Sequence, residues 1–222
     1  MPCVGFTRAP TPAFDRSLLP AEPDLAFEMN LWQAGFLAVA GIDEAGRGAL
    51  AGPVAAAAVI LPQKALIQKI LQGVRDSKQM TPLERAVARE RILEYASSWG
   101  VGFATSGEID LIGIVPATRL AASRALGDIS QPPDYLLLDY LFLPEVALPQ
   151  TALVKGDCRS LSIAAASVMA KTSRDALLVN LDQTYPGYGF AAHKGYGTQA
   201  HREAIRRLGP CPIHRLSFTL LP

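Results

Sequence analysis

The sequence predicts an α/β domain with a mixed β-sheet flanked by helices and with a helical C-terminal part. Short apolar segments of strand character alternate with longer segments of helical character, which is the pattern of layered α/β folds. The first three strand segments have short connections, so we expect part of the sheet to be antiparallel. With 222 residues, 50% of them hydrophobic, the chain is long enough to bury a substantial core.

Five segments have the length and apolar character of buried strands. The clearest contains three consecutive leucines, Leu136 to Leu138, which indicate burial on both faces of a sheet. The first is short, apolar and bounded by Gly41 and a charged pair. The predicted strands are residues 37–42, 54–61, 101–105, 135–140 and 151–154.

Four segments are predicted to be helices. The first begins at a recognisable signal, because Thr81 can cap the helix, Pro82 suits the first helical position, and Glu84 completes a capping box. The third is the longest and is rich in alanine. The predicted helices are residues 81–98, 116–126, 160–182 and 198–208.

Residues 1–35 differ from the rest of the chain in composition. They are rich in proline and show no sustained periodicity, which argues against a long helix or a central strand. We therefore predict a flexible or loosely docked extension over residues 1–35 and one ordered domain over residues 36–222.

Several classes of protein are excluded by composition. No uninterrupted apolar stretch reaches the roughly 18 residues that a membrane span needs. The cysteines Cys3, Cys158 and Cys211 are odd in number, widely spaced and without a CxxC pair, which argues against a disulfide framework or a thiolate zinc site. The N-terminus lacks the apolar core of a signal peptide. We expect a cytoplasmic monomer with no membrane partner.

Charge gives only a local indication of a nucleic-acid partner. The net charge of the chain is +1, so no global basic character is present. Residues 193–215, however, hold five basic residues and a single acid, Glu203. The basic residues are Lys194, Arg202, Arg206, Arg207 and Arg215. This stretch is a candidate for phosphate contacts.

Four acids stand where predicted strands end: Asp43, Glu44, Asp139 and Asp157. Two carboxylates about 4 Å apart repel by roughly 4 kcal/mol at an effective dielectric constant near 20. If the four converge, they need basic partners, raised pKa values or bound divalent metal, and an all-oxygen set favours Mg²⁺ or Mn²⁺. The alternative is that each is a solvated loop residue or a helix cap, with Asp157 and Ser160 competing to cap the long helix.

The segment 41–52 is dense in glycine, which exposes backbone N–H groups and permits close approach of another backbone. It lacks both the GxGxxG fingerprint and the GK[ST] of a P-loop. A tight structural turn is the alternative interpretation. The missing nucleotide motifs also count against a small-molecule phosphatase or kinase.

A series of motifs, in order from about residue 39 to 218, resembles the ribonuclease HII family. Each motif alone is modest, but so many in the right order are hard to attribute to chance. The motifs are Gly41-Ile42-Asp43-Glu44-Ala45-Gly46-Arg47-Gly48, Ala51-Gly52-Pro53-Val54, Asp76-Ser77-Lys78, Leu138-Asp139, Lys155-Gly156-Asp157, Ser162-Ile163-Ala164-Ala165-Ala166-Ser167, Ala170-Lys171, Arg174-Asp175, His193-Lys194-Gly195-Tyr196 and Gly209-Pro210-Cys211-Pro212-Ile213-His214-Arg215.

The resemblance implies a ribonuclease H-like mixed sheet and a metal-dependent catalytic domain. The implied catalytic acids, which would hold two divalent ions, Mn²⁺ or Mg²⁺, are Asp43, Glu44, Asp139 and Asp157. The implied substrate-binding residues are Gly46, Arg47 and Gly48 for the ribose 2′-hydroxyl, and Tyr196 for the next deoxyribose. Lys78 and Lys171 are either phosphate contacts or solvated lysines. The three histidines, His193, His201 and His214, are expected to be structural or to face solvent.

The activity implied by the resemblance is cleavage of RNA in RNA–DNA hybrids and on the 5′ side of single ribonucleotides in duplex DNA, a step of ribonucleotide excision repair. The products would carry 3′-hydroxyl and 5′-phosphate ends. A ribonuclease HIII-type enzyme and a catalytically silent hybrid-binding module are the alternatives; a 35-residue extension is too short for the extra domain of the former, and all four acids argue against the latter. The chain departs from the family at Tyr140, where glycine is usual, and at Gly197, where proline is frequent.

Overall fold

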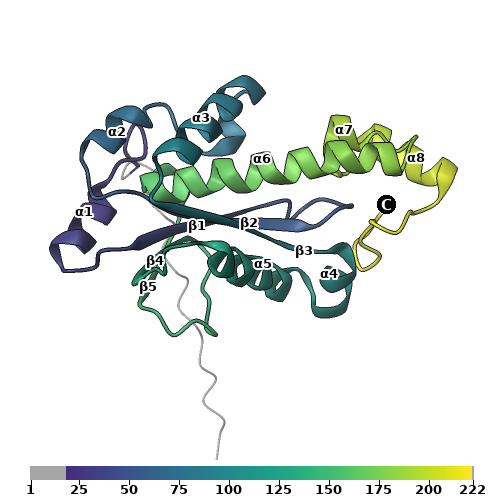
Figure 1. The fold of residues 1–222 in the computed structure, drawn as a ribbon. Coiled ribbons are helices and arrows are strands. Elements are labelled where there is room, and N and C mark those ends of the chain that lie inside the picture. Colours follow the sequence, from purple (N-terminus) through teal and green to yellow (C-terminus); the bar gives the residue numbers. More distant parts are fainter. Residues whose placement is uncertain (1–18, 222) are drawn as a thin grey trace, which may run out of the picture.

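A computed structural model describes residues 19–221, which are built on one mixed five-stranded sheet (Figure 1). The strands lie in the order β3-β2-β1-β4-β5. The first three pair antiparallel, as predicted, whereas β1, β4 and β5 run parallel. The strands are β1 (Val39–Ala45), β2 (Val54–Ile60), β3 (Ser98–Ala104), β4 (Tyr135–Asp139) and β5 (Gln150–Leu153).

Helices cover both faces of the sheet. The long helix α6 (Leu161–Thr184) lies on one face and α5 (Ile114–Asp128) on the other, so alternate residues of the alanine-rich strand β2 pack in opposite directions (Figure 1). A side chain at Gly41 would stand 2.2 Å from the backbone of Ser162, so glycine here lets β1 and α6 approach closely. This approach brings the start of α6 against the strand that carries two of the predicted acids.

The predicted helices are present, with shifted ends. α3 (Pro82–Tyr95) begins with the predicted capping box, in which Thr81 and Glu84 exchange hydrogen bonds. The final helix is α8 (Gln199–Leu208). Ser160 caps α6, because its hydroxyl accepts from the backbone N–H of Ile163, so the alternative of Asp157 as the cap is wrong.

The two strand boundaries that differ most from the sequence expectation are the end of β1 and the start of β3. β1 extends to Ala45 because Asp43 and Glu44 pair with Ala57 and Ala56 of β2, so these acids lie within the strand instead of after it. β3 begins at Ser98, which pairs with Ile60, and α3 therefore ends earlier than predicted. In both cases pairing across the sheet extends a strand beyond its apolar segment.

Within residues 19–221, four helices and two 3₁₀ turns were not predicted. The helices α2, α4 and α7 have only four to seven residues, and such short segments carry little periodicity. These elements are α1 (Ala26–Gln33), α2 (Leu66–Ile70), α4 (Ser106–Ile112), α7 (Phe190–His193), η2 (Ser77–Gln79) and η3 (Gly156–Cys158).

The expectation of a loosely docked extension through residue 35 is wrong for its described part. Glu28 of α1 is fully buried and accepts hydrogen bonds from the hydroxyls of Ser160 and Ser162, both at 2.6 Å, and from the N–H of Ser162. Asp24 also pairs with the chain before α6 through a short β-bridge. These contacts bind residues 24–34 to the core, and no local pattern could reveal a partner so distant in sequence. The remainder of the predicted extension, residues 1–18, lies outside the described residues.

The C-terminal part is organised around three histidines. His201 and His214 are buried, and their Nε2 atoms lie 3.1 Å apart. The ring of His193 stacks on that of His201 at 4.2 Å between centroids, and Phe190 contacts all three rings. The histidines are therefore structural, as expected. No helix within residues 19–221 is long and apolar enough to cross a membrane.

This cluster predicts a loss of stability in mild acid. Burial, with repulsion from His193 and His214, lowers the pKa of His201 to about 4 from its ordinary value of 6.5. Between these values the unfolded chain takes up a proton that the folded chain refuses, so stability falls as pH drops below 6.5 and this effect ends near pH 4. We expect the residue to remove about 2 kcal/mol of unfolding free energy between pH 7 and pH 5.

Denaturant titration at both pH values measures this difference. The variant His201→Asn cannot take up the proton, so its unfolding free energy should lose about 2 kcal/mol less than that of the parent over the same interval. An identical pH dependence in the two proteins contradicts the prediction.

Candidate active site

Three carboxylates from distant segments meet at one end of the sheet. Asp43 lies in β1 and Asp139 ends β4, and the parallel register that pairs Ile42 with Leu138 brings the two acids to the same level. Asp157 lies in the turn η3, directly before α6. One oxygen from each of these three residues falls within 4.8 Å of the others.

Local hydrogen bonds orient these side chains. The backbone N–H of Gly156 donates to Asp139 Oδ1 at 2.8 Å, and the N–H of Glu44 donates to Asp43 Oδ1 at 2.7 Å. A Cβ at Gly156 would lie 2.8 Å from the side chain of Ile163 and 3.3 Å from the backbone of Asp139, so glycine permits this close approach. The Lys155-Gly156-Asp157 segment therefore places one acid and orients another.

The cluster is electrostatically unfavourable as it stands. Burial, together with repulsion from Glu44 and Asp139, raises the pKa of Asp43 well above its ordinary value. Burial also raises the pKa of Asp139, and burial with repulsion from Asp139 and Asp76 raises that of Asp157 to about 6. Within residues 19–221 none of the three forms an ion pair. Bound cations would relieve this repulsion.

The acids of this cluster change the pKa of Lys78, which lies in the turn η2. Burial by itself would lower its pKa, but Asp43, Asp76 and Asp157 together raise it. Lys78 and Lys155 both act on Asp139, and two ammonium groups offset only part of the negative charge of the converging carboxylates.

The donor atoms fit a divalent metal. Asp157 Oδ1 and Glu44 Oε2 are buried and have no hydrogen-bond partner in the described part of the chain. A buried carboxylate oxygen without a partner is costly unless a cation satisfies it. The oxygen donors of Asp43, Asp139 and Asp157 match the preference of Mg²⁺ and Mn²⁺.

Glu44 lies beside the cluster rather than within it. Its charge acts on both Asp43 and Asp139, but its carboxylate is outside the group of three and its Oε1 forms an ion pair with Arg47 at 3.2 Å. The structure thus brings together three of the four predicted acids directly, with the fourth adjacent.

All the predicted substrate-binding residues line one pocket next to the acids. The pocket has a volume of about 510 Å³ and contains Glu44 in its wall. Arg85 and Ser77, which no pattern in the sequence marked as substrate contacts, also line it. The predicted residues in its lining are Gly46, Arg47, Gly48, Lys78, Lys171 and Tyr196.

Two buried arginines hold the carbonyl groups of the glycine-rich loop. Arg215 donates to the carbonyls of Gly46, Arg47 and Gly52 at 2.8 to 3.0 Å. Arg174 donates to those of Ala51, Pro53 and Lys194 over the same range of distances. Both side chains are fully buried. The structure therefore corrects the expectation that the whole basic stretch 193–215 contacts phosphates, because Arg215 is used internally.

The glycine-rich loop also carries backbone donors without an acceptor. Within the described chain, the backbone N–H groups of Arg47 and Gly48 have no acceptor. Gly46 adopts a positive φ of 90°, and a Cβ there would lie 2.0 Å from Arg174 Nε. The loop is thus shaped by contacts that only glycine permits, and it presents two unpartnered donors.

The ring of Tyr196, in the lining of the pocket, contacts two cations. Lys171 Nζ and the Arg174 guanidinium are 5.4 and 5.5 Å from its ring centroid. Lys171 also forms an ion pair with Asp175 at 2.8 Å. Tyr140 stands where the family usually has glycine. Its backbone adopts a positive φ of 53°, a conformation that glycine takes readily, so the backbone here has the conformation expected of the usual glycine.

Most of the chain matches one known protein family. The family model described as Ribonuclease HII matches residues 40–221. The chain belongs to the ribonuclease HII family. A curated ribonuclease HII from Synechococcus sp. (strain JA-3-3Ab) is 54% identical over 200 residues, which is 90% of each chain. Another, from Roseiflexus castenholzii, is 53% identical over 88% of each chain.

Solved structures support the same fold. The ribonuclease H2 of Pyrococcus horikoshii OT3 is 26% identical, with a TM-score of 0.66 over 82% of this chain and 94% of that one. The fold is also shared with Bst-RNase HIII, solved in complex with Mn²⁺, at a TM-score of 0.62 and 19% identity over 85% of this chain and 69% of that one. Membership of the ribonuclease HII family makes this protein an enzyme with ribonuclease H activity. The family and the fold thus agree with the expectation from the sequence.

Proposed function

We propose that this enzyme hydrolyses the phosphodiester on the 5′ side of a ribonucleotide, both in RNA–DNA hybrids and at single ribonucleotides in duplex DNA. The observation that carries the proposal is the meeting of two buried carboxylates, Asp43 and Asp157, with the half-buried Asp139, beside a pocket lined by backbone N–H groups that have no acceptor in the described chain. The first feature suits metal-assisted hydrolysis and the second suits recognition of a hydroxyl group.

The acids Asp43, Glu44, Asp139 and Asp157 would hold two divalent ions, Mg²⁺ or Mn²⁺. When bound, such ions lower the pKa of the attacking water and neutralise charge on the leaving oxygen. The unpartnered oxygens of Glu44 and Asp157 support this assignment. Bst-RNase HIII, which shares the fold, was solved in complex with Mn²⁺, and this agrees with the assignment. Asp43 and Asp139 keep their relative positions through the parallel pairing of β1 with β4.

The glycine-rich loop would distinguish RNA from DNA. A ribose 2′-hydroxyl both donates and accepts hydrogen bonds, so backbone groups can recognise it. The N–H groups of Arg47 and Gly48 are free to donate, because Arg215 holds only the carbonyl side of the same loop. Deoxyribose leaves such donors without a partner, which lowers the affinity of the site for DNA alone.

Tyr196 and the lysines would position the substrate strand. The ring of Tyr196 would pack against the deoxyribose that follows the ribonucleotide. Lys78 and Lys171 line the same pocket and would contact phosphates. The partners are thus an RNA–DNA hybrid or a DNA duplex that contains ribonucleotides, and the protein would act as a cytoplasmic monomer.

The test uses a DNA duplex with one embedded ribonucleotide and a matched duplex of DNA alone. We expect a single cut 5′ of the ribonucleotide, with 3′-hydroxyl and 5′-phosphate ends, in Mg²⁺ or Mn²⁺ and none with a chelator. The DNA duplex should stay intact. Binding of the ribonucleotide duplex without cleavage in either metal would instead favour a hybrid-binding module.

A further inference from the structure

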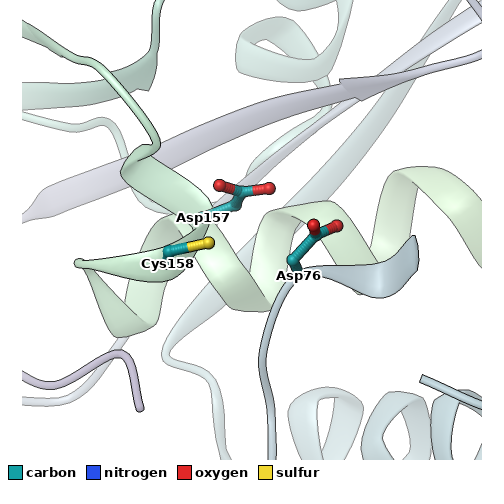
Figure 2. Close-up of side chains that lie close together, drawn as sticks. All are labelled: Asp76, Asp157 and Cys158. Atoms are coloured by element: carbon teal, nitrogen blue, oxygen red, sulfur yellow. The ribbon is translucent and has the colours of Figure 1, made fainter. Parts of the chain in front are cut away.

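A second group of potential ligands adjoins the catalytic carboxylates. One atom each from Asp76, Asp157 and Cys158 lies within 4.8 Å of the others (Figure 2). Asp76 precedes η2, where it accepts from the N–H of Lys78, and Cys158 ends η3. Asp157 belongs to both groups, so the two sets of ligands share one carboxylate.

The donor types of this group differ from those of the catalytic acids. Asp43, Asp139 and Asp157 offer only oxygen, whereas the second group adds the sulfur of Cys158. A thiolate favours zinc and softer cations over Mg²⁺ or Mn²⁺, and zinc accepts mixed sets of cysteine and carboxylate ligands. The absence of a CxxC spacing does not exclude such a site, since Asp76 comes from a separate turn.

The shared carboxylate keeps one oxygen without a partner in this position. Asp157 is 3% exposed, and its Oδ1 makes no hydrogen bond within residues 19–221. The other two residues converge on one weak donor, because the amide of Gln79 lies 3.3 Å from Asp76 Oδ2 and 3.9 Å from Cys158 Sγ. A cation could replace these long contacts at small cost.

We propose that Asp76, Asp157 and Cys158 bind zinc or another thiophilic divalent cation, which inhibits the enzyme by withdrawing Asp157 from the catalytic carboxylates. A tetrahedral zinc with ordinary bond lengths places its ligand atoms about 3.4 to 3.6 Å apart, so the present spacing needs to close by only about 1 Å. The thiol proton of Cys158 is released to solvent when the cation binds. The inhibitory effect rests on the proposed function, whereas the binding site does not.

Cadmium tests the binding directly, because its bond to a thiolate absorbs in the ultraviolet. We expect the full chain, titrated with Cd²⁺ alone, to develop this absorbance at one equivalent. Cys158→Ser should abolish it, and Asp76→Asn should weaken binding about tenfold. The matched control is Cys211→Ser, since Cys211 Sγ lies 3.1 Å from His214 Nδ1 and is the other thiol among residues 19–221. Absorbance that survives Cys158→Ser, or disappears with Cys211→Ser, overturns the proposal.

Inhibition is measured separately, with Zn²⁺ added to reactions that contain saturating Mg²⁺. Cys158→Ser should require about tenfold more Zn²⁺ for half inhibition than the parent. Equal inhibition of the two proteins overturns the inhibitory role. A parent protein that cuts in neither Mg²⁺ nor Mn²⁺ contradicts the proposed function instead, and the cadmium absorbance still decides whether the cation site exists. Thermal melts of each variant establish that it is folded.

Discussion

Asp43→Asn is expected to reduce cleavage of a ribonucleotide-containing duplex on the order of 10³-fold or more. The carboxylate of Asp43 stands with those of Asp139 and Asp157, and a neutral amide binds divalent cations weakly. Loss of metal binding removes several kcal/mol of transition-state stabilisation, and each 1.4 kcal/mol corresponds to a factor of about ten in rate. Single-turnover cleavage at saturating Mg²⁺ or Mn²⁺ measures the effect.

The fold should survive this substitution. Burial and neighbouring acids raise the pKa of Asp43, so removing its charge relieves repulsion, and the melting temperature should be equal to or above that of the parent. Asp139→Asn is expected to behave in the same way. The matched control is Asp128→Asn on the exposed end of α5, where the amide oxygen can still accept from the N–H of Val101. Near-normal turnover in Asp43→Asn would remove this residue from the proposed metal site.

Arg215→Met is expected to lower the unfolding free energy by about 3 kcal/mol or more, since it leaves three carbonyl acceptors without their donor. These carbonyls belong to Gly46, Arg47 and Gly52, so the loop that lines the pocket loses its support. We also expect kcat/KM for the single-ribonucleotide duplex to fall, while the three catalytic carboxylates keep their positions. Denaturant titration and steady-state kinetics measure the two effects.

The same reasoning applies to Arg174→Met, because Arg174 supports Ala51 and Pro53 of the loop. The control is Arg206→Met on α8, where the side chain is exposed and the change in unfolding free energy should stay within about 0.5 kcal/mol. If Arg215→Met unfolds with the same free energy as Arg206→Met, the buried arginine does not support the loop.

Local chemistry was sufficient to predict the main elements of the sheet and its helices. The capping box at Thr81 and Glu84 depends on residues three apart, and the leucines of β4 indicate burial by their own composition. The end of β1 and the start of β3 were not predicted correctly, because pairing with β2 determines where these strands begin and end. Short helices such as α4 escaped because seven residues give too little periodicity.

The family and its acids were recognisable from ordered motifs, but their arrangement was not. The spacing of Asp43, Asp139 and Asp157 in the sequence does not show that one oxygen of each lies within 4.8 Å of the others. That proximity depends on the parallel pairing of β1 with β4 and on the turn before α6. Arg215 looked like part of a basic surface, and only its burial showed that it holds backbone carbonyls.

The amino-acid sequence by itself determined which residues are available for chemistry: acids at strand ends, glycines in a turn and an alanine-rich helix that can pack closely on a sheet. The tertiary structure alone decided which of them meet. It docked Glu28 of α1 against Ser160 and Ser162, and it brought Asp76 beside Cys158. The physical reason is that these contacts join segments about 80 to 130 residues apart, so they are stabilised by the folded core and leave no local pattern in the chain.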